Sequence, residues 1–249
     1  RHRLLLRNLR MYRHLSYWCV TIVFALSLAS CGAPDQFGVI AKDLKSSDAK
    51  IRSAALGRLA TMKSSSTAAV PYILKALKDD SEDVRISALD ALVSLSLKSQ
   101  LGAIADVVKN DKSTSVRNRA MDSAVSMDPE SSETLGILKD AMNDQDLSIS
   151  LAAATKIFDL GKGASLVNEL VAVMKKELDE GDASSPPTMA MRLGGDLGPK
   201  AAAAAPVIQA HLNKPGLSQV NKMMLEAALR QVKGEQIGEL PDTQNTKPQ

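Results

Sequence analysis

The chain has 249 residues, 45% hydrophobic and 24% charged, a composition that favours an ordered protein. The net charge is +3, but residues 1–30 hold five arginines and no acid, so the remainder carries about −2 (3 − 5). If that segment is removed, the basic character that would favour nucleic acid is lost. Beyond residue 31 the aromatic residues are Phe37, Tyr72 and Phe158 and the histidine is His211, which argues against base-stacking platforms, most nucleophile and base pairs, and transition-metal sites.

The N-terminal segment has the layout of a secretory signal peptide. An uncharged apolar run, residues 17–29, follows Arg10 and Arg13. This run is too short for a transmembrane helix, which needs roughly 20 residues. The sequence therefore predicts a signal peptide over residues 1–30. Because Met11 lies at a natural distance before the apolar run, residues 1–10 are interpreted as an upstream over-read of the gene.

The apolar run ends in Leu28-Ala29-Ser30-Cys31, followed by Gly32. This order, an apolar residue, two small residues and a cysteine, resembles the lipobox of bacterial lipoproteins. The resemblance implies that Cys31 is acylated and becomes the new N-terminus, with residues 31–34 as a short linker, and that Gly32 favours sorting to the outer membrane. The alternative is an ordinary signal peptide in which the cysteine is incidental.

A repeated pattern organises the rest of the chain. A polar turn is followed by a β-branched residue, often by an arginine, and then by alanine and leucine. The β-branched anchors Ile51, Val84, Val116 and Ile149 are 33, 32 and 33 residues apart, by subtraction. Each anchor begins a first helix, and segments with apolar residues at helical spacing predict the second helices. These lie at residues 37–44, 69–77, 101–108, 135–142, 166–178 and 201–212.

The alternation of helices resembles HEAT or HEAT-like (armadillo-type) repeats in a short form. The resemblance implies an all-α fold, an α-solenoid of stacked antiparallel hairpins with about five repeats and half-repeats at both ends, over residues 35–232. The fifth unit is degenerate, and residues 181–187 are predicted to form a loop that lengthens it. A last half-unit begins near Val220. Residues 233–249 have few apolar side chains and two prolines, and they predict a disordered tail.

Three arginines, Arg52, Arg85 and Arg117, occupy equivalent places in successive repeats and are expected to form a ladder. The functional interpretation is a stripe that binds anions. The structural interpretation is that each guanidinium forms hydrogen bonds with turn carbonyls or nearby carboxylates. We prefer it because acidic residues recur close to the arginine in the repeat. The candidate carboxylates are those of Asp48, Asp83 and Asp111.

Other candidate sites are weaker. Four lysines recur near the ends of second helices, which in HEAT-like folds line the concave surface, and they are candidates for contact with a partner: Lys42, Lys75, Lys139 and Lys175. Acidic turns at residues 79–83 and 143–146 lack EF-hand spacing and are interpreted as helix caps, so we expect no metal and no cofactor. Hydrolase and phosphate-loop motifs are absent, and no enzyme is predicted.

The resulting hypothesis is a lipoprotein, anchored to a bacterial membrane through Cys31 on the periplasmic or surface side, whose concave surface binds an envelope protein or peptide. We expect neither nucleic acid nor a small-molecule substrate as a partner. Two alternatives remain: a purely structural lipoprotein or an accessory subunit of an envelope enzyme, and a HEAT-repeat lyase, which the export signal argues against.

Overall fold

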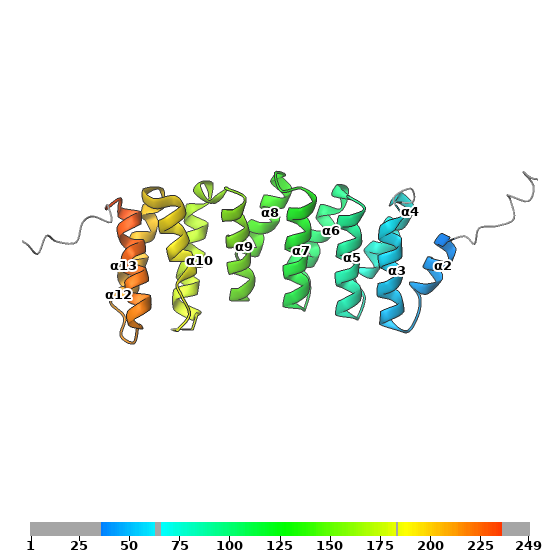
Figure 1. The fold of residues 1–249 in the computed structure, drawn as a ribbon, viewed down its shortest axis with the longest axis horizontal. Helices are drawn as coiled ribbons and strands as arrows, with labels where there is room; N and C mark the ends of the chain where they lie inside the picture. The colour runs from blue at the N-terminus through cyan, green and yellow to red at the C-terminus, as the bar shows by residue number, and fades with distance from the viewer. Residues whose placement is uncertain (1–35, 63–65, 183, 236–249) are drawn as a thin grey trace, which may run out of the picture.

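The computed structural model describes residues 36–62, 66–182 and 184–235, and in these ranges the regular structure is helical (Figure 1). The predicted signal peptide, Cys31, the linker and the tail beyond residue 235 lie outside the described residues. The α-helices are α2 (Gln36–Asp43), α3 (Ala49–Thr61), α4 (Ser66–Ala76), α5 (Glu82–Ser94), α6 (Leu101–Asn110), α7 (Thr114–Met127), α8 (Ser132–Ala141), α9 (Leu147–Asp159), α10 (Val167–Glu180), α11 (Thr188–Arg192), α12 (Ala205–Leu212) and α13 (Gln219–Lys233).

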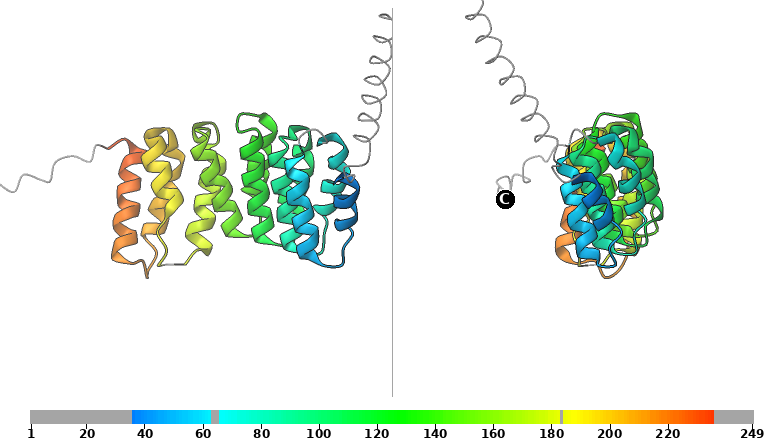
Figure 2. Two further views of the ribbon diagram at one scale, coloured as in Figure 1. Left: turned by 45° about the vertical axis from the view of Figure 1, so that its right-hand side comes forward. Right: turned by 90° about the vertical axis from the view of Figure 1, so that its right-hand side faces the viewer.

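The helices form a row two layers deep, as Figures 1 and 2 show. The first layer holds α3, α5, α7, α9, α11 and α13, and the second holds α2, α4, α6, α8, α10 and α12. Helices within a layer pack together, as α3 does with α5 and α6 with α8, and each second-layer helix also packs on the first-layer helix that follows it in the chain. Five antiparallel hairpins, flanked by single helices α2 and α13, make up the array. The predicted α-solenoid is confirmed.

Local sequence explains where the first helices start. The side chain of Asp48 accepts a hydrogen bond from the backbone N–H of Lys50, at the start of α3, and Asp146 does the same for Ser148 at the start of α9. Such caps satisfy N–H groups that have no partner within the helix. The first helices of the regular units therefore begin at the polar turns of the repeat.

The four anchors of the repeat show how the units cover one another. Val84, Val116 and Ile149 are buried at 0–1% exposure, whereas Ile51 is 42% exposed. Ile51 lies on α3, and the described chain has no first-layer helix before α3 to cover it. The exposure of this anchor marks the N-terminal end of the described stack.

Alanines set the close spacing of the first layer. One alanine per regular unit, four residues after the anchor, is fully buried. Small side chains at these places let helices approach closely, so that leucine and isoleucine side chains interdigitate around them. The four alanines are Ala55, Ala88, Ala120 and Ala153.

The fifth unit is irregular. Its first helix, α11, continues as a π-helical turn, Leu193–Leu197, and its second helix begins as a 3-10 helix, Gly198–Ala204, before α12. The sequence predicted one continuous helix over residues 201–212. Pro206 cannot donate a backbone hydrogen bond and is tolerated only in the first turn of an α-helix, so α12 begins at Ala205. At Gly194 a Cβ atom would lie 3.0 Å from Cα of Ala228, so α13 packs here against bare backbone.

Candidate interaction surface

The three arginines occupy equivalent positions at the edge where each hairpin passes to the next. Each guanidinium reaches back to its own turn: Nη1 of Arg85 donates to the carbonyl of Asp79 at 2.9 Å, and Nη1 of Arg117 donates to the carbonyl of Asp111 at 3.0 Å. Arg52 bonds the carbonyls of Ser46 and Ser47 in the same way. The arginine side chain thus closes the turn that precedes its own helix.

Each arginine also pairs with an aspartate of the following unit. Arg52 pairs with Asp79 at 2.7 Å, Arg85 with Asp111 at 2.7 Å and Arg117 with Asp144 at 3.0 Å. Asp111 was among the acids expected as partners. Asp48 instead caps α3 and Asp83 lies in the first turn of α5, so neither bonds an arginine.

The side chain of each paired aspartate also accepts a hydrogen bond from the backbone N–H two residues further along the chain. Asp79 accepts from the backbone N–H of Ser81 at 2.9 Å, and Asp111 accepts from that of Ser113 at 2.8 Å. Because Arg52 donates to it, the pKa of Asp79 is lowered. One ion pair therefore joins two consecutive turns, and three such pairs define what we call the arginine ladder: Arg52–Asp79, Arg85–Asp111 and Arg117–Asp144.

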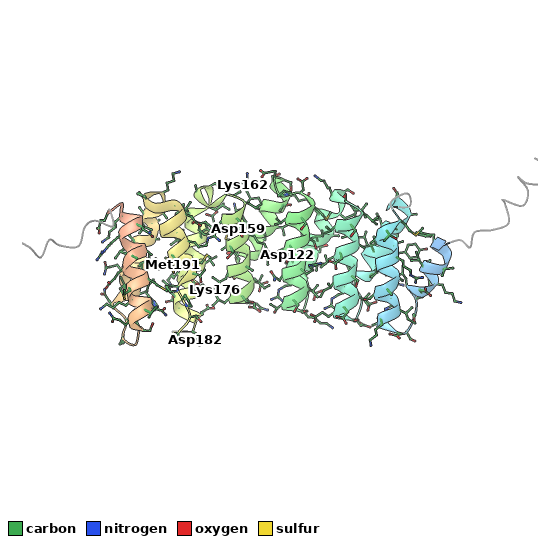
Figure 3. The ribbon with its side chains drawn as sticks, in the orientation of Figure 1. Asp122, Asp159, Lys162, Lys176, Asp182 and Met191 are labelled. Carbon is green, nitrogen blue, oxygen red and sulfur yellow. The ribbon has the colours of Figure 1, made fainter. Side chains whose placement is uncertain are left out.

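The fourth unit replaces the ladder with a lysine from another helix. Ser150 stands where the arginine would be, and its hydroxyl donates to the carbonyl of Asp144 at 3.0 Å. Lys176, on α10, donates from Nζ to the carbonyls of Asp144 at 2.6 Å and Gln145 at 3.1 Å (Figure 3). Lys176 therefore supplies from the neighbouring helix the positive charge that the arginine supplies to the earlier turns.

The acid of the fourth unit remains although its arginine is lost. Glu177 follows Ser150 by 27 residues, the same separation as Arg52 and Asp79 by subtraction. Its carboxylate accepts from the backbone N–H groups of Thr188 at 3.0 Å and Met189 at 2.9 Å, which caps α11. Burial raises the pKa of Glu177, while the two backbone donors oppose that shift. Sequence reasoning missed both Lys176 and Glu177, although the 27-residue spacing of Glu177 from Ser150 was a usable signal.

The second layer carries a series of grooves. A groove of about 860 Å³ lies between α6 and α8, one of about 620 Å³ between α8 and α10, and one of about 340 Å³ between α10 and α12. The first two share the turn at residues 143–145. Asp106 and Asp140, which line the first groove, and Glu180, which lines the second, form no ion pair within the part of the chain that the structure describes.

The four candidate lysines lie on second-layer helices, on α2, α4, α8 and α10, and differ in their engagement. Lys139 pairs with Glu169 at 3.6 Å, and Lys175 pairs with Asp179 at 2.6 Å. Hydrogen bonds from Lys175 and Lys214 lower the pKa of Asp179 to about 2. Lys42 and Lys75 are exposed and, among the described residues, have no acidic partner. The structure does not gather the four lysines into one site.

The first layer has a different surface, closed by ion pairs between adjacent helices. Arg119 donates to Asp90 at 2.7 Å, Lys156 pairs with Asp122, and Arg192 pairs with Asp159 at 3.0 Å. Asp122 and Asp159 lie along the front of the row in Figure 3. Arg192 also lies 4.8 Å from the centroid of the Phe158 ring. These pairs link adjacent helices of the first layer.

A cavity of about 540 Å³ opens in the fifth unit, beside the loops at residues 181–187 and 213–218. Leucines of α9, prolines of both loops and His211 line it. Burial lowers the pKa of His211, and its Nδ1 atom is buried without a hydrogen-bond partner in the described structure. The long loop was predicted; the cavity was not.

The described residues contain no group of three or more histidine, cysteine, aspartate or glutamate side chains arranged to hold a metal ion. Within the same residues, every helix is too short or too polar to cross a membrane.

The fold and this surface define an α-solenoid of stacked helical hairpins. Residues 39–124, less than half of the chain, match the family model of HEAT repeats. The match supports a HEAT-like repeat protein. A crystal structure of an engineered protein, 18% identical, covers 81% of this chain and 98% of its own with a TM-score of 0.44. A search of curated proteins finds no match.

Proposed function

We propose that the protein is a membrane-anchored scaffold that binds another protein through the second layer of its solenoid. The observation that carries this proposal is the series of grooves in the second layer. Carboxylates such as Asp106 and Asp140 line the groove between α6 and α8 and have no ion-pair partner in the described structure. Extended surfaces of this kind suit protein or peptide ligands.

The site of action is the cell envelope of a bacterium, and the support for it comes from the sequence. The apolar run ends in a lipobox-like Leu28-Ala29-Ser30-Cys31, and several acyl chains on Cys31 would hold the protein firmly, because each buried methylene contributes about 0.8 kcal/mol. We propose attachment to the outer membrane, on its periplasmic or surface side, since Gly32 follows the cysteine. The role is binding rather than catalysis.

Membrane fractionation tests the anchor. The full chain is expected in the membrane fraction and released by detergent, while the Cys31→Ser variant is expected in the soluble fraction. Mass spectrometry of the purified protein would detect acyl chains on Cys31. A Cys31→Ser variant that stays with the membrane, or an unmodified Cys31 in the wild type, contradicts lipid anchoring.

Site-directed photo-crosslinking tests the binding surface. A photoreactive amino acid at Asp140, beside the groove of about 860 Å³ between α6 and α8, is expected to form one dominant adduct in living cells. The matched control places it at Ser126, an exposed residue of α7 in the first layer. Equal adducts at the two positions, or adducts only at Ser126, would place the partner elsewhere.

A further inference from the structure

The N-terminal edge of the solenoid combines exposed apolar and positively charged side chains. We define this N-terminal edge by Val39 and Lys42 of α2, Lys45 of the following turn, and Lys50 and Ile51 of α3, all of them exposed. Val39 is 46% exposed and Ile51 42%. The large exposed hydrophobic residues of the described chain number five, so this short edge holds two of them.

The three lysines of this edge are available to a ligand. None of them forms an ion pair among the described residues. The nearby acids are engaged instead: Asp43 pairs with Arg58, and the Asp48 side chain accepts the N–H of Lys50. The edge therefore presents positive charge, although the chain after residue 30 has a net charge near −2. Local charge decides the contact, because salt screens charges farther away than about 8 Å.

The Ile51 side chain lies on the outer face of the stack. Ser53 of α3 forms a hydrogen bond with Ser87 of α5, and this contact marks the side of α3 that meets the next repeat. Ile51 lies two residues before Ser53, about 160° away around a helix of 3.6 residues per turn, and so faces away from α5. The terminal units of a solenoid usually need a polar outer face for solubility. This one is apolar and basic.

The proposed lipid attachment site lies close to this edge in the chain. Residues 32–35 separate Cys31 from Gln36, the first residue of α2. Even fully extended, such a link spans only about 18 Å, at 3.3–3.6 Å per residue. A lipid on Cys31 therefore holds α2 close to the headgroups. Figure 1 places α13 at the opposite end of the row.

We propose that the N-terminal edge binds the anionic headgroups of the membrane, so that the lipidated solenoid stands on its first repeat. This inference rests on the proposed anchoring at Cys31. Lys42, Lys45 and Lys50 attract the headgroups, while Val39 and Ile51 enter the boundary between headgroups and acyl chains. The edge fixes the orientation of the row and leaves the grooves of the second layer free for a partner.

Tryptophan fluorescence tests the orientation. Trp18 is the only tryptophan in the sequence, so residues 31–249, which hold every described helix, contain none. Cys31, the only cysteine of that segment, is coupled to a maleimide lipid in vesicles. Val39→Trp then reports contact through quenching by brominated lipids. The control is Val220→Trp on α13, where the valine is 59% exposed.

For Val39→Trp we expect quenching at least about twofold stronger in vesicles with roughly one third phosphatidylglycerol than in pure phosphatidylcholine, since anionic lipid attracts the lysines. Replacing Lys42, Lys45 and Lys50 with glutamate should abolish this difference. The same change at Lys200, Lys222 and Lys233, exposed residues of the C-terminal part, should leave it intact. Circular dichroism verifies that all variants stay helical.

Three results would overturn the inference: equal quenching in the two lipid mixtures, equal quenching of Val39→Trp and Val220→Trp, or no effect of the N-terminal charge reversal. Because the tether is made chemically, the result does not depend on whether cells acylate Cys31. A failure of the proposed anchoring would show in the fractionation experiment, and a failure of this inference only in the vesicles.

Discussion

The first three repeats and the last two satisfy the polar groups of the turns between units with different residues. From α3 to α8 an arginine on each first helix closes its own turn and pairs with the next aspartate, as Arg85 does with Asp111. From α9 onward the arginine is replaced by Ser150, the turn is held by Lys176, and Glu177 caps α11 without an arginine. What persists is the satisfaction of buried polar groups, not the identity of the side chain.

The difference also accompanies a change of shape. In the regular half the two layers consist of α-helices, and a short 3-10 turn, Lys98–Gln100, lies in the connection between α5 and α6. In the fifth unit a π-helical turn and a 3-10 segment belong to the layers themselves, and two longer loops lie beside the cavity of about 540 Å³. The fourth unit keeps two regular α-helices without its arginine, whereas the fifth unit, whose repeat pattern is degenerate, has also lost the regular geometry. The C-terminal half therefore depends on individual contacts, each of which can be broken separately.

Removing an arginine from the regular half should have the largest effect. Arg85→Ala leaves the buried Asp111 carboxylate without its cation, so we expect a loss of about 3–5 kcal/mol in the free energy of unfolding. Urea denaturation followed by circular dichroism measures it. Arg119→Ala, which removes an exposed pair with Asp90, should cost less than about 1 kcal/mol. Equal losses would mean that burial of the ladder contributes nothing.

Filling the close contact at Gly194 should have the next largest effect. In Gly194→Ala the added methyl group meets the backbone of Ala228, and overpacking of this kind costs about 1–3 kcal/mol. The neighbouring Gly195→Ala is the control, because a Cβ atom there meets nothing within 4 Å. Hydrogen exchange should show the loss concentrated in α13. A stable Gly194→Ala protein with unchanged α13 protection would refute the contact.

The lysine substitute should matter less than the arginine that it replaces. Lys176→Met leaves the carbonyls of Asp144 and Gln145 without this donor, at a cost of about 1–3 kcal/mol. Lys175→Met breaks only an exposed pair with Asp179 and should leave the free energy of unfolding almost unchanged. The comparison uses the same denaturation assay. If the two variants are equally stable, Lys176 does not hold the turn.

The smallest effect is electrostatic and distinguishes the two halves directly. Asp79, which accepts from Arg52, should titrate below its ordinary pKa of 3.8, and Glu177, which is partly buried and has no arginine partner in the described structure, above 4.5. Asp79 therefore stabilises the fold above pH 3.8, and this contribution is lost as the pH falls. The contribution of Glu177 is present below pH 4.5 and is lost as the pH rises through its folded pKa. Carbon-13 NMR of both carboxyl groups measures the shifts, and shifts in the same direction would contradict the distinction.

The sequence allowed much of the fold to be predicted because the signals were periodic. The anchors from Ile51 to Ile149 placed the first helices, and apolar spacing placed the second helices. The partner of each arginine was harder to foresee, because it lies in the next unit, 26 or 27 residues along the chain, where local reasoning from nearby acids such as Asp48 does not reach. The π-helical turn and the role of Lys176 depend on packing between helices, for which no single residue carries a signal.

The way in which each arginine finds its aspartate has a consequence for the length of the molecule. Since the arginine belongs to one unit and its acid to the next, every junction between units is electrically alike in the regular half. Deleting residues 81–112 would remove one period and still leave Arg52 with Asp79 and Arg117 with Asp144. Whole units can therefore be lost or gained in this part of the solenoid during evolution without leaving an unpaired arginine or aspartate at the junction between two units.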